Sequence, residues 1–248
     1  MESVRIKLKI SYIGTEFSGW QIQIGQRTVQ GCLEECLKKI CERDIRIHGA
    51  GRTDAGVHAL GQVAHCDIPV KKKHIPWQKA LNSLLPKDIS IVETEFVAKD
   101  FHARLSAKAK IYSYTLWTEP KFIYPMRRPF CWQVGKIDVD KMLKAAKLLE
   151  GTRDFKCFQN KGTDVKNTVR TIFKIFCIPG IFPQEKKIYF IGDGFLKQMV
   201  RNIMGSLYRI GKGKMSIEEF KELIEQKDRT LLPMTAPAHG LCLEEILY

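Results

Sequence analysis

Residues 49–58 carry the side chains best placed to do chemistry, in the sequence GAGRTDAGVH. Their one carboxylate, Asp54, lies two positions after Arg52 and has glycines on both sides. Glycine has no Cβ, so a backbone rich in it can turn sharply and approach a ligand closely. A carboxylate held in such a loop can act as a nucleophile or accept a proton. The alternative is a plain turn, in which the side chain of Asp54 bonds a nearby amide.

Two phosphate-binding motifs fail here on spacing. Gly51 and Gly56 are spaced as in a Walker loop, but Val57 stands where that loop requires lysine. A dinucleotide-binding fingerprint needs a glycine three residues after Gly51, and that residue is Asp54. The loop is therefore not a nucleotide-binding loop of either kind.

Residues 110–117 alternate as a strand, which places Tyr112 and Tyr114 on the same face. Aromatic side chains on a sheet face beside basic residues can stack nucleobases. The RNP1 pattern of RNA-recognition sheets is absent. Both tyrosines could instead be core residues whose hydroxyls are hydrogen-bonded.

Helical spacing predicts a helix over 195–210 whose polar face carries Lys197 and Arg201, four residues apart. Arg201 could pair with a buried carboxylate, contact phosphate or be an ordinary surface arginine. Gly205 weakens this helix unless another backbone comes close to it. The lysines at 71–73 could contact phosphate or form a solvated charge run.

The charge balance favours a polyanionic partner. Lys and Arg number 41 against 27 Asp and Glu, a formal net charge of +14, and both halves of the chain share the excess. Basic side chains gain affinity by releasing the counterions that condense on phosphates. The composition alone does not separate nucleic-acid binding from other functions of a basic protein.

We expect neither a signal peptide nor a membrane span, because no apolar run approaches the roughly 20 residues that a spanning helix needs. The 8 cysteines contain no Cys-x-x-Cys pair, and Cys32 and Cys36 fall on the apolar face of a helical pattern. Such thiols suit buried positions in a reducing cytoplasm. His58 and His65 belong to no metal-ligand spacing, so we expect no metal.

The first half of the chain predicts the element order β-α-β-β-α-β. Thr28 is placed to cap the first helix, and Pro86 ends the second. The expected strands are 4–12, 45–49, 60–68 and 89–97, and the expected helices are 29–42 and 77–85.

The second half repeats that order. Its expected strands are 110–117, 168–178, 187–193 and 241–247, and its helices are 138–150, 195–210 and an extra one at 216–226. We therefore predict an α+β fold of two tandem β-α-β-β-α-β (ferredoxin/RRM-like) domains, residues 1–105 and 106–248. Their mostly antiparallel sheets would pack side by side around a central basic cleft.

Six blocks along the chain resemble the tRNA pseudouridine synthase A family. They are residues 19–23 (GWQIQ), 51–58 (GRTDAGVH), 101–107 (FHARLSA), 110–114 (KIYSY), 201–207 (RNIMGSL) and 236–241 (APAHGL). The blocks occur in the family's order, and the series extends from residue 19 to residue 241, so that it spans nearly the whole chain. One position departs, since Ile13 stands where the family usually has Asp after the tyrosine of its first strand. This puts a local turn contact in doubt, not the activity.

The resemblance implies a cytoplasmic homodimer that isomerises uridine to pseudouridine at positions 38, 39 and 40 of the tRNA anticodon arm, without cofactor or metal. It assigns Asp54 as the catalytic carboxylate, kept ionised by Arg52 or Arg201. Tyr112 would stack on the extruded uracil and assist removal of its C5 proton. Arg52 and Arg104 would fill or brace the space that the base vacates.

Two other functions stay open at this point. One is a noncatalytic RNA-binding module, in which the Asp54 loop is a structural turn. The other is an N-glycosidase that releases the base to water. Such hydrolysis usually uses a second carboxylate to activate the water, and none lies near Asp54 in the sequence.

Overall fold

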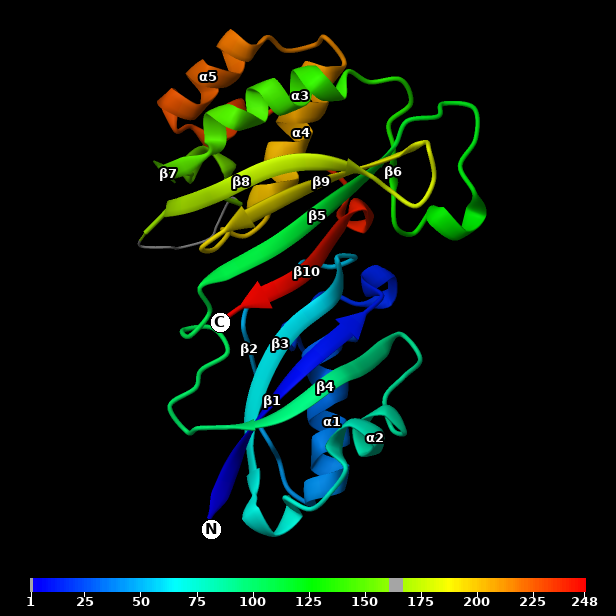
Figure 1. The fold of residues 1–248 in the computed structure, drawn as a ribbon, viewed down its shortest axis with the longest axis vertical. Helices are drawn as coiled ribbons and strands as arrows, with labels where there is room; N and C mark the ends of the chain where they lie inside the picture. The colour runs from blue at the N-terminus through cyan, green and yellow to red at the C-terminus, as the bar shows by residue number, and fades with distance from the viewer. Residues whose placement is uncertain (1, 161–166) are drawn as a thin grey trace. The chain divides into compact units, whose positions relative to one another are not determined.

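Residues 2–160 and 167–248 are described by the computed structural model, and the chain divides into two units. Unit 1 comprises Met1–Lys108 and Leu243–Tyr248, and unit 2 comprises Ala109–Cys242 (Figure 1). Both units contain mostly antiparallel sheet and α-helix, which confirms the predicted α+β class. The predicted domain limits, their tandem relation and the basic cleft remain predictions.

Strand β1 (Ser3–Tyr12) is an inner strand of the sheet of unit 1. It pairs antiparallel with β4 (Ile89–Val97) on one side and with β3 (His58–Pro69) on the other. The short β2 (His48–Gly49) also pairs antiparallel with β3, and β10 (Leu241–Leu247) is a further neighbour of β3.

The core of unit 1 lies between this sheet and helices α1 (Val29–Cys41) and α2 (Trp77–Asn82) (Figure 1). Every second residue of β1 from Ile6 to Tyr12 is buried, as is typical of a strand with one face on the core. Thr28 caps α1 as predicted, because its side chain accepts a hydrogen bond from the N–H of Gly31 at 3.2 Å. The helix stops at Glu42, whose φ of 58° is left-handed.

The sheet of unit 2 has the order β5-β9-β8-β7, and all of its neighbouring pairs are antiparallel. These strands are β5 (Ala109–Trp117), β7 (Gly151–Asp154), β8 (Val169–Pro179) and β9 (Glu185–Gly192). The two-residue β6 (Trp132–Gln133) pairs parallel with β5. Strands β6 and β7 were not predicted, because so few residues carry no measurable alternation.

Helices α3 (Val139–Ala146) and α4 (Met199–Gly211) pack against each other in unit 2, and α5 (Ile217–Gln226) follows α4 (Figure 1). Asp138 caps α3, and a capping box formed by Ser216 and Glu219 begins α5. Short 3-10 turns complete the chain at Gly14–Glu16, Val70–Lys72, Pro125–Arg127, Lys147–Leu149, Lys156–Phe158, Arg229–Leu231 and Ala238–Gly240.

The predicted helix over 195–210 begins too early. The backbone of Gln198 has a φ of 61°, so the chain cannot be helical through this residue, and α4 starts at Met199. Lys197 therefore precedes the helix and does not share a helical face with Arg201. Another backbone does come close to Gly205, because a Cβ there would overlap the carbonyl oxygen of Met234.

The 8 cysteines all lie in the described part of the chain and form no disulfide. Cys36 is buried on α1 as predicted, whereas Cys32 is only half-buried. No helix in residues 2–160 or 167–248 has the length and apolar character needed to cross a bilayer.

Candidate active site

The loop that carries Asp54 joins β2 to β3 in unit 1, and the main chain of residues 17–20 holds it. The N–H of Trp20 donates to the carbonyl oxygen of Thr53 at 3.1 Å, and the N–H of Gly56 donates to that of Phe17 at 3.3 Å. Within the loop, the N–H of Val57 donates to the carbonyl oxygen of Asp54 at 3.2 Å. The main chain on both sides of Asp54 is thus anchored.

Two glycines outside the loop make this approach possible. Gly19 has a φ of +94°, and a Cβ on it would lie 2.7 Å from the carbonyl oxygen of Thr53. A Cβ on Gly14 would overlap the carbonyl oxygen of Val57. The segment around residues 14–20 therefore packs on the loop through its bare backbone. This explains physically why glycine begins the block GWQIQ.

Side chains fix the same loop at three more points. The hydroxyls of Tyr12 and Thr53 share a buried hydrogen bond of 2.8 Å. The amide nitrogen of Gln62 donates to the carbonyl oxygen of Gly51 at 3.0 Å. The Nδ1 atom of His58 accepts from the N–H of Gly14 at 3.0 Å, which requires that this nitrogen carry no proton.

Asp54 itself is half-buried, and Arg52 is exposed. Arg52 forms no hydrogen bond or ion pair with any residue that the structure describes. The expectation that Arg52 keeps Asp54 ionised therefore receives no support from an ion pair. The arrangement is a partly accessible carboxylate on a loop with a fixed main chain, which suits nucleophilic or proton-accepting chemistry.

Tyr114 in unit 2 is a core residue. It is fully buried, and its hydroxyl donates to the carbonyl oxygen of Pro237 at 2.7 Å. Burial raises the pKa of this phenol well above its ordinary value of 10.0. A Cβ on Gly240 would lie 2.6 Å from the ring, so the block APAHGL packs directly on Tyr114. For this tyrosine the core alternative was right.

Tyr112 lies on the same face of β5 and is also buried, with 8% of its surface exposed. Its ring meets that of Phe195 edge-on, with centroids 5.3 Å apart and planes at 82°. Edge-to-face contact holds the plane of the ring in one orientation. A stacking role for Tyr112 remains a prediction.

Arg201 lies on α4 and is half-buried. Its Nε donates to the carbonyl oxygen of Ala236 at 2.8 Å, and the N–H of Ala236 donates back to the carbonyl oxygen of Arg201 at 3.0 Å. The next residue, Asn202, is fully buried and accepts a hydrogen bond from the hydroxyl of Thr235 at 2.6 Å. Two sequence blocks, RNIMGSL and APAHGL, are thus fastened together within unit 2. No sequence signal indicates the pairing between Asn202 and Thr235, because these residues are far apart along the chain.

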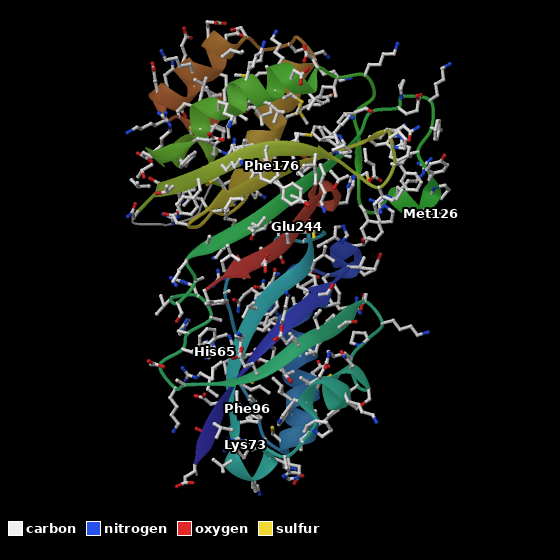
Figure 2. The ribbon with its side chains drawn as sticks, viewed as in Figure 1. His65, Lys73, Phe96, Met126, Phe176 and Glu244 are labelled. Carbon is white, nitrogen blue, oxygen red and sulfur yellow. The ribbon has the colours of Figure 1, made fainter. Side chains whose placement is uncertain are left out.

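The remaining basic residues differ in their surroundings. Lys72 pairs with Glu42 at 3.0 Å. The Nζ atom of Lys73 lies 5.5 Å from the ring centroid of Phe96, and both residues are labelled in Figure 2. Arg104 is exposed and, as for Arg52, its side chain has no hydrogen bond or ion pair to a described residue. Of the predicted site residues, unit 1 carries Arg52, Asp54 and Arg104, and unit 2 carries Tyr112 and Arg201.

No group of three or more His, Cys, Asp or Glu side chains within residues 2–160 and 167–248 is arranged to hold a metal ion. His58 and His65 each use Nδ1 to accept a hydrogen bond from a main-chain N–H.

Comparison with known proteins identifies the same family that the sequence blocks resemble. The sequence model of the family described as tRNA pseudouridine synthase matches residues 9–105 and 145–248. The "tRNA pseudouridine synthase A" of Solidesulfovibrio magneticus is 51% identical over 249 residues, which cover 98% of this chain and 91% of that protein. The protein of the same name from Maridesulfovibrio salexigens is 49% identical over 244 residues, which cover 98% and 90%. That of Geobacillus kaustophilus is 44% identical over 246 residues, which cover 98% and 94%.

These matches define an isomerase that acts on tRNA. The chain belongs to the tRNA pseudouridine synthase family.

Proposed function

We propose that this enzyme converts uridine to pseudouridine at positions 38, 39 and 40 of the tRNA anticodon arm, with Asp54 as its catalytic carboxylate. The observation that carries the proposal is the anchoring of Asp54. Its loop is fixed through Thr53, Gly56 and Val57, while the carboxylate-bearing residue stays partly accessible. Catalytic groups act best when the surrounding structure holds them in position before the substrate binds.

The reaction needs few groups because it is an isomerisation. The N1–C1′ bond breaks, the freed uracil turns, and a C5–C1′ bond forms. C5 then loses its proton, while N1 gains one, so that product and substrate have the same composition. No electron is gained or lost. The ionised carboxylate serves either of two routes, attack on C1′ or removal of a proton from the sugar.

The other predicted residues receive roles in this proposal. The target base must leave its stack before C1′ can be reached. Arg52 and Arg104 would fill or brace the space that the base leaves, which their exposed side chains allow. Tyr112 would stack on the extruded uracil and assist the loss of the C5 proton. Arg201 would favour the ionised form of Asp54.

The proposal also includes the organisation expected from the sequence. It comprises tandem α+β domains around a basic cleft and a cytoplasmic homodimer. A cleft lined by basic side chains would attract the tRNA backbone and raise the rate of encounter. The net charge of +14 supports the basic character of the proposed cleft.

A product assay tests the proposed function. Transfer RNA labelled in its uridines is incubated with the enzyme, digested to nucleosides and separated. We expect the labelled uridine to become pseudouridine that remains part of the tRNA. Free uracil would identify an N-glycosidase, and unchanged uridine with bound tRNA would identify a binding module. Replacing the uridines at positions 38, 39 and 40 by cytidine one at a time then shows which positions are used.

A further inference from the structure

Three successive main-chain N–H groups in unit 1 donate to histidine side chains. The first belongs to Ala103 and donates to Nδ1 of His65 at 3.1 Å. The N–H groups of Arg104 and Leu105 both donate to Nδ1 of His102, at 3.1 and 3.3 Å. His65 lies on β3 (Figure 2), whereas His102 begins the turn itself. Two imidazoles thus determine the path of residues 103–105.

His102 and Ser106 close the turn from both ends. The N–H of His102 donates to the hydroxyl oxygen of Ser106 at 3.0 Å, and the N–H of Ser106 donates to the carbonyl oxygen of His102 at 2.9 Å. A side chain at each end therefore accepts from the main chain near the other end, as in a helix capping box. Such reciprocal bonds satisfy N–H groups that a short turn would leave unpaired.

Neighbouring residues hold the carbonyl groups of the same segment. The hydroxyl of Tyr248 donates to the carbonyl oxygen of Ala103 at 2.7 Å. The guanidinium of Arg5 donates to the carbonyl oxygen of Phe101 at 2.8 Å while it also pairs with Asp67. The backbone before and within the turn is thus bonded to the sheet of unit 1 and to its C-terminal residue.

This fixed backbone presents two side chains to solvent. The side chain of Arg104 is exposed and forms no hydrogen bond or ion pair with a described residue, and 73% of Leu105 is exposed. A turn that served only to connect elements would not need three main-chain N–H groups that donate to imidazole rings. Fixing the backbone reduces the conformational freedom that an arginine loses when it binds, so its contact becomes stronger.

The acceptor role requires both imidazoles to be unprotonated at Nδ1. Burial lowers the pKa of His65 to about 4, and the charges of Arg5, His102 and His48 act in the same direction, against Asp67. The rings of His65 and His102 have centroids 4.7 Å apart, and those of His65 and His48 lie 5.2 Å apart. The Nδ1 atom of His65 is therefore available at neutral pH to accept the hydrogen bond from the N–H of Ala103.

We propose that His65 and His102 are positioning residues for substrate binding, which fix the turn at 103–105 so that Arg104 contacts the bound tRNA. The choice of tRNA as ligand rests on the proposed function. The positioning role of His65 and His102 rests on the geometry of the turn.

Substitution by asparagine tests whether Nδ1 of His102 acts as the acceptor. The Oδ1 atom of asparagine is attached to Cγ, as Nδ1 is in histidine, so it can accept the same hydrogen bonds. We expect His102→Ala to raise the Kd for tRNA about tenfold, whereas His102→Asn recovers most of the affinity. His48→Ala is the matched control. It removes a neighbouring imidazole that neither donates nor accepts a hydrogen bond within the described turn, so the tRNA affinity of this variant should equal that of the wild type. Because His65 is buried, His65→Asn is compared with His65→Leu only after both show cooperative unfolding.

A double-mutant cycle tests whether His102 acts through Arg104. Arg104→Ala alone should weaken tRNA binding about tenfold, and adding His102→Ala to it should change the Kd by less than about twofold. Amide hydrogen exchange at residues 103–105 should be faster in His102→Ala and close to wild type in His102→Asn. Additive effects on Kd, or unchanged affinity in both single variants, would overturn the proposal.

The affinity cycle and the product assay fail in different ways. If the wild-type enzyme bound tRNA but produced no pseudouridine, the proposed reaction would be wrong, and the cycle would still decide the role of the turn. If pseudouridine formed normally while the cycle was additive, only the role of His65 and His102 would be rejected.

Discussion

The hydroxyl groups of Tyr12 and Thr53 lie 2.8 Å apart and share a buried hydrogen bond. It joins the last residue of β1 to the residue directly before Asp54. The core strand of unit 1 thereby helps to set the position of the proposed catalytic carboxylate. Loss of either hydroxyl would leave the other buried without this partner.

We expect Tyr12→Phe and Thr53→Val each to lower the free energy of unfolding by about 1 kcal/mol. Both should also reduce kcat more than KM, because a looser loop misplaces Asp54 without removing tRNA contacts. Urea unfolding and steady-state kinetics measure the two effects. In the double variant the losses should be smaller than their sum, and full additivity would show that the hydroxyl pair does not act as a unit.

Tyr112 allows the ring and the hydroxyl to be separated. Tyr112→Phe keeps the ring that meets Phe195 edge-on, so tRNA affinity should stay within about twofold while turnover falls. Tyr112→Leu should reduce turnover as well and weaken tRNA binding by about 1–3 kcal/mol. Thermal unfolding of both variants shows whether the core of unit 2 is intact. Equal turnover in Tyr112→Phe and wild type would exclude a proton-transfer role, and a harmless Tyr112→Leu would make Tyr112 a core residue only.

Much of unit 1 could be predicted from its sequence because its signals are local. Alternation along β1, the helical spacing of α1 and the cap at Thr28 each depend on residues within a few positions of one another. The start of α4 could not be predicted in this way. Leu196 fits the helical pattern, but the left-handed backbone of Gln198 keeps the chain from being helical before Met199.

The candidate site was predicted only as far as residue types allow. Asp54 stands out by its glycine-flanked loop, and the sequence blocks indicate the family. The hydrogen bond between Tyr12 and Thr53 joins residues far apart in the chain, and polar residues at such spacing carry no pairing signal. Tyr112 and Tyr114 share one strand face, as period-two alternation requires, but alternation does not tell how deeply a face is buried.

The salt dependence of binding should report contacts with the tRNA backbone. We expect log Kd to rise with log salt concentration with a slope of about 3 or more, which corresponds to several phosphates. Arg104→Ala should reduce this slope by about 1, whereas Lys221→Ala on α5 should leave it unchanged. Fluorescence anisotropy over a series of salt concentrations gives the slopes. A flat dependence in the wild type would contradict a partner held through its phosphates.

The pH dependence of stability should reflect His65. Its pKa of about 4 in the folded chain lies below its ordinary value of 6.5, so the unfolded chain takes up a proton first as pH falls. The stabilisation is therefore complete above about pH 6.5 and is lost progressively towards pH 4, by at most about 1.4 kcal/mol per pH unit. Burial also lowers the pKa of His239, which adds in the same direction.

The comparison with His65→Asn isolates this contribution. The substituted asparagine keeps an acceptor but cannot titrate, so the free energy of unfolding should depend less on pH in the window below the ordinary pKa of histidine. Urea unfolding at three pH values in this window provides the measurement. Because Arg5 lowers the pKa of Asp67 below its ordinary value of 3.8, that carboxyl titrates below the window. Parallel pH profiles for the two proteins would show that His65 does not titrate as proposed.

Asp54→Asn is the decisive change for the reaction. Asparagine is nearly isosteric with aspartate, and the hydrogen bond from Val57 reaches the main-chain carbonyl of residue 54, so the loop should persist. The amide can neither attack C1′ nor accept a proton usefully. We expect an unchanged oligomeric state, near-normal tRNA affinity and a loss of pseudouridine formation of about a thousandfold or more.

Asp44→Asn makes the same change of charge at an exposed residue that pairs with Lys38, and it should keep full activity. Tm, tRNA affinity and product are measured on one preparation of each variant. If Asp54 were only a turn former, activity would survive in Asp54→Asn or would fall together with Tm. Loss of product with Tm and affinity retained separates chemistry from folding, because the only group removed is then the negative charge of one carboxylate. Retained turnover in Asp54→Asn would remove Asp54 from the mechanism.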